Sequence, residues 1–251
     1  MIMNGTVSSS IAAANNIFSS WYVTLVDVCT FGLMGLQAGL SECTHAGLSG
    51  VKCFSSLDGL DSAIVPTHDM SKGPHPTGYC LVVRLPDVPQ DAMAILLSLG
   101  SMPLNIYTHV VVLSYVEPDI VRRFLLGGGV NRPVRILDSR LPITALCRAI
   151  VPPTSLEPLP LTWFGEVFLP RLTSLFTPGE MRALWSVQKA IPMYKQVIRT
   201  GVSNKTLYNQ RNTALRKLGV RSVNDLIRIL LSKRIYLRDE GVEVHAHGNV
   251  R

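Results

Sequence analysis

The sequence predicts an α/β domain with a doubly wound parallel sheet, followed by a proline-rich linker and an all-α domain of four helices. Short runs of Val, Leu and Ile alternate with helical segments from residue 21 to residue 151, which is typical of a parallel sheet covered on both faces. Helix start and stop signals recur from residue 174 to residue 237. The charge divides in the same way: residues 171–251 hold 15 Lys and Arg against 5 Asp and Glu, whereas residues 1–170 hold 9 against 12. A chain of 251 residues can bury a core in each part.

The strands of the first domain are predicted from five apolar runs, at 22–26, 51–54, 79–85, 110–114 and 134–137. Helices are predicted at 31–40, 90–99, 119–126 and 143–151, the third of them stopped by three glycines. After the second strand comes a loop at 68–78 that is rich in Pro, Gly and His. Five such strands with helices between them are typical of the flavodoxin-like doubly wound fold, so the first domain is expected at 21–151.

Three segments are expected to lie outside the two domains. Residues 1–20 lack the basic start of a secretory signal and indicate a flexible tail, residues 152–173 contain five prolines and form the linker, and residues 238–251 form a C-terminal tail. No run approaches the ~18 apolar residues of a membrane helix, so the protein is expected in the cytoplasm. The cysteines include no CxxC pair, and neither a metal nor a cofactor is predicted.

Capping signals place the four helices of the second domain, which is expected at 174–237. Thr177, Pro178 and Glu180 match a capping box with Pro at the first helical position, so the first helix begins there and runs to about residue 189. The second helix is short and spans 192–199, the third spans 204–218 and the fourth spans 223–232, with glycines at 201 and 219 ending the second and third. A short helix, a tight turn and a longer polar helix make a helix-turn-helix.

The third of these helices holds side chains suited to DNA. Its apolar residues can face a core, and these are Leu207, Ala214, Leu215 and Leu218. Its other side presents groups that bond to phosphates and base edges, namely Lys205, Tyr208, Asn209, Arg211, Asn212 and Arg216. Together with the basic balance of residues 171–251, this predicts a transcription regulator that binds double-stranded DNA at the nucleoid and has no enzymatic activity.

The segment 203–222, SNKTLYNQRNTALRKLGVRS, resembles the recognition helix and following turn of LuxR-type regulators of the FixJ/NarL kind, and about 65 residues share the resemblance. It implies base contacts from Lys205, Tyr208, Asn209 and Asn212. It implies phosphate contacts near the start and the basic end of the helix and from the second helix, by Thr206, Arg211, Arg216, Lys217 and Lys195. Ser203, which caps the helix, is counted among the DNA-binding residues. Two residues depart from the family: Gln210 replaces a usual His, and Thr200 replaces a core Leu, so the second helix is expected to pack less well.

A DNA-binding domain of this type that follows a five-stranded domain suggests a phosphorylatable receiver. Such a receiver needs particular charged residues at its strand ends. The chemistry requires an acceptor Asp after the third strand, acidic Mg²⁺ ligands after the first and a Lys on the fifth. Asp27 is the single acid after the first strand, the third strand ends in residues 82–85 without a carboxylate, and Leu137 stands near the place of the Lys. Ser114 alone matches the usual hydroxyl. The domain is therefore expected to be a degenerate pseudo-receiver that is not phosphorylated.

The segment 26–40, VDVCTFGLMGLQAGL, resembles the corresponding segment of the Rcs auxiliary activators of capsule regulation. That resemblance implies a heterodimer with a phosphorylatable LuxR-type partner, and a homodimer stays open. A partner is needed because one helix-turn-helix reads only a few base pairs. Its contact surface is expected either on the apolar stripe of the fourth helix, 223–231, or on the helices of the α/β domain. The α/β domain is favoured, because a domain without switch chemistry would be retained mainly for contacts.

Two other functions stay open. A small-molecule-gated LuxR-type receptor would need an aromatic-lined pocket, and only 7% of the residues are aromatic. An enzyme of the flavodoxin-like fold would need a phosphate-binding loop after the first strand, for which residues 28–32 are poorly suited.

Overall fold

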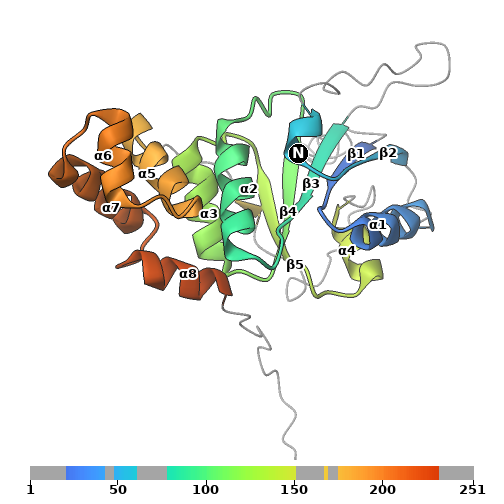
Figure 1. The fold of residues 1–251 in the computed structure, drawn as a ribbon. Coiled ribbons are helices and arrows are strands. Elements are labelled where there is room, and N and C mark those ends of the chain that lie inside the picture. Colours follow the sequence, from blue (N-terminus) through green and yellow to red (C-terminus); the bar gives the residue numbers. More distant parts are fainter. Residues whose placement is uncertain (1–20, 43–47, 61–77, 151–166, 169–174, 232–251) are drawn as a thin grey trace, which may run out of the picture.

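Six strands form one sheet in the order β2-β1-β3-β4-β5-β6 in the computed structural model, which describes residues 21–42, 48–60, 78–150, 167–168 and 175–231 (Figure 1). Five strands run parallel, and they are β1 (Trp21–Val26), β2 (Leu48–Phe54), β3 (Gly78–Arg84), β4 (His109–Ser114) and β5 (Val134–Asp138). Their order is that of the flavodoxin-like doubly wound fold, so the predicted sheet is confirmed. β6 (Val167–Phe168) pairs antiparallel with β5.

Helices cover both faces of the sheet (Figure 1). α1 (Thr30–Glu42) and α4 (Ile143–Ile150) lie on one face, and α2 (Pro89–Ser101) and α3 (Pro118–Gly128) lie on the other, with the short 3-10 helix η1 at Leu57–Leu60. Successive strand residues point to opposite faces: Val82 belongs to the core beneath α1 and α4, and Val83 to the core beneath α2 and α3. No helix in the described ranges is long and apolar enough to cross a membrane.

The glycines at the end of α3 differ from the prediction. The helix does not stop before them but continues through Gly127 and Gly128, and it ends at Gly129, whose φ of 99° suits glycine. A Cβ on Gly128 would lie 2.7 Å from the Cα of Gly100 in α2, and a Cβ on Gly127 would meet the ring of Phe176. The two helical glycines are therefore required by close packing rather than by helix termination.

Four helices follow as predicted, to within two residues at each end. They are α5 (Pro178–Gln188), α6 (Met193–Thr200), α7 (Asn204–Lys217) and α8 (Val223–Leu231). Thr177 and Glu180 form both hydrogen bonds of the predicted capping box at the start of α5. Gly201 and Gly219 have φ of 68° and 76° after α6 and α7. The short-range capping signals therefore predicted these helices well.

The four-helix segment packs directly on the α/β domain through α2 (Figure 1). Leu226 and Leu230 of α8 and Leu184 of α5 are buried in the same core as the α2 and α3 side chains. The backbone N–H of Phe176 donates to the carbonyl of Gly127 over 2.7 Å. The apolar stripe of α8, one of the two surfaces considered for a partner, is thus largely used within the chain.

Several other predictions meet the structure only in part. β6 falls inside the predicted linker and was missed, because two residues do not make a recognisable apolar run. The tails at 1–20 and 238–251, residues 68–77 of the polar loop and most of the linker at 152–173 lie outside the described residues.

Candidate nucleic-acid interface

The exposed face of α7 presents a row of basic and amide side chains. Lys205, Asn209, Asn212 and Arg216 follow one another at spacings of four, three and four residues, which places them on one side of the helix. Leu207, Ala214 and Leu215 on the other side are buried and fix the orientation of the helix. Tyr208 flanks the row with 53% of its surface exposed. This row, called the reading face below, can donate to phosphates and base edges without repacking the core.

The start of α7 lies beside the reading face. Ser203 caps the helix: its hydroxyl accepts from the backbone N–H of Thr206 over 3.2 Å and lies 2.9 Å from the Thr206 hydroxyl. Both side chains are exposed together with Lys205. Free backbone N–H groups and the positive end of the helix dipole favour an anion at such a terminus. Ser203 and Thr206 thus stand where a phosphate can approach, although their hydroxyls already bond to each other.

A polar recess lies between α7 and α8 and has a volume of about 260 Å³. It is lined by Arg211 of α7 and by Arg221, Ser222 and Asn224 around the start of α8. The guanidinium of Arg211 lies 5.4 Å from the ring centroid of Tyr208, and its Nε is buried without a hydrogen-bond partner among the described residues. Arg211 thus lines this recess together with Asn212 of the reading face, and both side chains are half-buried. Arg221 and Ser222 were missed by the sequence reasoning, although the cap at Ser222 marked this helix start.

Lys217 makes two contacts within the protein that the sequence did not predict. Its ammonium donates to the Glu180 carboxylate over 2.6 Å and to the carbonyl of Leu175 over 2.7 Å. Burial alone would raise the pKa of Glu180, but hydrogen bonds from Lys217 and from the Thr177 backbone outweigh it and hold the pKa below its ordinary value. Lys217 therefore ties the end of α7 to the start of α5. The structure thus gives Lys217 a structural ion pair, and its expected phosphate contact stays a prediction.

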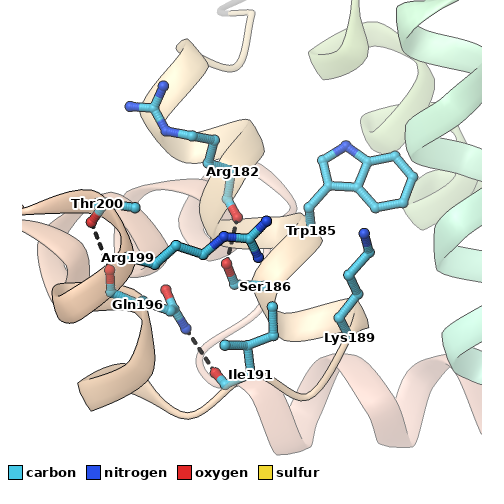
Figure 2. Close-up of a pocket in the computed structure, with 8 residues that line it drawn as sticks. All are labelled: Arg182, Trp185, Ser186, Lys189, Ile191, Gln196, Arg199 and Thr200. Atoms are coloured by element: carbon cyan, nitrogen blue, oxygen red, sulfur yellow. Dashed lines mark hydrogen bonds between the residues drawn. The ribbon is translucent and has the colours of Figure 1, made fainter.

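α6 is loosely packed, as its sequence predicted. None of its side chains is fully buried, and Thr200 is exposed where a core Leu is usual. Lys195 is exposed on α6. Gln210, which stands where a His is usual, packs against Gly179 at the start of α5, where a Cβ would collide with its amide group. A groove remains open between α5 and α6 (Figure 2).

The carboxyl ends of β1 and β3 hold an internal ion pair. Asp27 is buried, its Oδ1 accepts from the backbone N–H of Cys29 over 2.8 Å, and its Oδ2 lies 3.5 Å from Nη1 of Arg84. Arg84 is the last residue of β3. A Cβ on Gly32 would collide with the Asp27 carboxylate and the Arg84 guanidinium, so glycine is required beside the pair. The guanidinium of Arg84 therefore offsets the charge of the buried Asp27.

The neighbouring strand ends are also engaged internally. The Ser114 hydroxyl accepts from the backbone N–H of Val116 over 2.9 Å. Asp138 at the end of β5 forms a 2.6 Å ion pair with Arg140, and the Tyr115 hydroxyl donates to the carbonyl of Asp87 over 2.9 Å. No group of three His, Cys, Asp or Glu side chains able to hold a metal occurs in the part of the chain that the structure describes.

No protein-family model matches the chain, and no curated protein matches it. Among solved structures, the chain is similar to the two-component response regulator RcsB in its DNA complex, with a TM-score of 0.46 and 18% identity over 85% of this chain and 100% of that one. RcsB from Salmonella enterica serovar Typhimurium bound to the promoter rprA gives a TM-score of 0.43 and 17% identity, over 86% and 98% of the two chains. The response regulator StyR gives 0.33 and 16%, over 84% and 98%. These values assign the chain to no family.

Proposed function

We propose that the protein is a sequence-specific transcription regulator that reads double-stranded DNA with α7. The observation that supports this most is the exposed reading face, which lies between the starts of α7 and α8. Lys205, Asn209 and Asn212 would meet base edges in the major groove, with Tyr208 beside them. Arg216, Arg211 and the start of α7 at Ser203 and Thr206 would hold phosphates on either side, and Lys195 would reach the backbone from α6.

The α/β domain would serve as a pseudo-receiver that is not phosphorylated. Arg84 cannot accept a phosphoryl group, and its guanidinium already neutralises Asp27, the single acid after β1. An ion pair in that place removes both the acceptor and the Mg²⁺ site. The domain would keep its fold and its surface while lacking the switch.

Dimerisation or partner binding would then fall to the α/β domain, because the stripe of α8 is used within the chain. Apolar side chains are exposed near the start of α1, with Val28, Phe31 and Met34 exposed to 56%, 86% and 61%. Two reading modules about one helical turn, roughly 10 bp, apart would supply the affinity that a single module lacks. The second module would come from another copy or from another LuxR-type regulator.

DNA binding is tested by titrating the full-length protein into a fluorescent 30-bp duplex at several salt concentrations. Each neutralised phosphate contributes about −0.9 to the slope of log K against log salt, so four to five contacts predict a slope of roughly −4. We expect binding that weakens steeply with salt. A folded protein that does not bind, or that binds with a slope near zero, would contradict the proposal.

The absence of phosphorylation is tested with acetyl phosphate and Mg²⁺. We expect the intact mass, the peptide map and the affinity for DNA to stay unchanged after incubation, because β3 ends in Arg84. A bona fide receiver treated in parallel shows that the reagent is active. A phosphoaspartate at Asp27 or Asp87 would refute the pseudo-receiver assignment.

A further inference from the structure

A groove of about 270 Å³ lies between α5 and α6 (Figure 2). Trp185 of α5 and Ile191 of the turn supply its apolar lining, and three cations stand around it. These are Arg182 of α5, Lys189 directly after α5 and Arg199 of α6, all exposed. The groove exists because α6 lacks a buried side chain and ends in Thr200.

The three cations have no acidic partner among the described residues. The nearest charge-related contact is that of Lys189, whose ammonium lies 5.8 Å from the centroid of the Trp185 ring. The neutral polar groups of the groove are already bonded to backbone carbonyls: Ser186 donates to Arg182 and Gln196 donates to Ile191. The guanidinium and ammonium groups are therefore the donors left for an incoming anion.

The groove faces away from α7. The α5 residues packed on α7 include the buried Glu180, Ala183 and Leu184, whereas the groove is lined by Arg182 and Ser186 on the other side of the same helix. α5 would therefore lie between the groove and a duplex bound to the reading face. Arg182 and Lys189 are thus separate from the DNA contacts proposed for α7. Arg199 lies one helical turn after Lys195 on α6, so its part in DNA binding is measured separately below.

We propose that this groove binds an acidic segment of a partner protein, which seats one apolar side chain against Trp185 and Ile191 between the three cations. Charge complementarity selects an acidic occupant, because three cations surround the groove and no described carboxylate pairs with them. A volume of about 270 Å³ is enough to hold one apolar side chain. Trp and Arg are also the side chains that most often dominate protein interfaces. A regulator bound to DNA through α7 would hold this segment at the same time.

The test uses two fluorescein-labelled 12-residue peptides with the full-length protein. One alternates Asp or Glu with Leu or Phe, and the other carries Ser in place of Leu and Phe. We expect the first to bind about fivefold tighter or more, and to change the tryptophan emission. The variant Arg182→Gln with Arg199→Gln should lose about fivefold or more in affinity for it, because each exposed charge pair contributes about 0.2–1 kcal/mol. The variant Lys52→Gln with Arg148→Gln, which removes two exposed cations of the α/β domain, should bind like the original chain.

Three outcomes would overturn the proposal. Equal affinity for the two peptides would show that the groove binds no apolar side chain. An equal loss of peptide affinity in both variants would show only long-range electrostatic attraction. The third concerns DNA, for which both variants should keep the salt slope of the original chain. A slope reduced by about one per arginine in the groove variant alone would assign the groove to DNA phosphates. Because that DNA titration is run on the same proteins, a failure of peptide binding is distinguished from a failure of the proposed function.

Discussion

Reversing two charges on the reading face, with Lys205→Glu and Arg216→Glu together, is expected to lower the affinity for duplex DNA by about 60-fold at roughly 0.1 M salt. The lost phosphate contact of Arg216 costs about eightfold there, because affinity scales with salt to a power of about −0.9 for each contact. The lost base contact of Lys205 costs a similar factor, since such a contact is worth about 1–3 kcal/mol. Both side chains are exposed and outside the core, so the fold should be unaffected. Fluorescence anisotropy with a labelled duplex measures the change.

The matched control is Lys52→Glu with Arg148→Glu, which alters the net charge equally on the α/β domain. It should lower the affinity by no more than about threefold, since exposed charges beyond a Debye length of ~10 Å are largely screened. If the control loses as much affinity as the reading-face variant, DNA binding depends on net charge alone, and α7 is not the interface.

Replacing Gly128 with Ala is expected to destabilise the protein by about 2 kcal/mol, although Ala is the better helix former. The added methyl would lie 2.7 Å from the Cα of Gly100, and neither backbone can give way without separating α2 from α3. That separation would open the core beneath both helices, where Phe124 and Leu125 are fully buried. Thermal unfolding should begin several degrees lower, as ~1 kcal/mol corresponds to about 2–4 °C for a chain of this size.

Gly35→Ala is the control within the same sequence. Gly35 is also helical, but it is exposed on α1, and a Cβ there would meet its nearest neighbour, Ile143, at 4.0 Å. Ala should therefore stabilise the protein by up to about 1 kcal/mol through helix propensity. The same substitution thus changes stability in opposite directions at the two sites. Stabilisation by Gly128→Ala would show that α2 and α3 do not pack backbone to backbone.

The helices of the C-terminal segment are predictable from sequence because their signals are local. The capping box at Thr177, the cap at Ser203 and the left-handed residues Gly201 and Gly219 act within one helical turn. The five parallel strands are predictable for a similar reason, since each is an apolar run bounded by turn residues. Residues 127–129 were misread because a glycine chosen for close packing looks the same in sequence as one that ends a helix.

The functional residues divide in the same way. The reading face was predicted because its spacing follows helical geometry along one segment. The ion pair of Lys217 was not predicted, since its partner Glu180 is 37 residues away and pairing at that distance leaves no sequence pattern. The pair of Asp27 with Arg84 and the groove between α5 and α6 were unpredictable on the same ground, because each depends on how separate elements pack.

Selection of duplexes from a random pool by the full-length protein tests most directly whether α7 reads bases. The account predicts enrichment of a short motif of a few base pairs by the original chain. It also predicts that Asn212→Ala binds with relaxed preference at one position of that motif, by an amount corresponding to about 1–3 kcal/mol for a lost base contact. An enriched motif that is unchanged when both Asn209 and Asn212 are replaced, or no enrichment by a protein that still binds DNA, would contradict base recognition by α7.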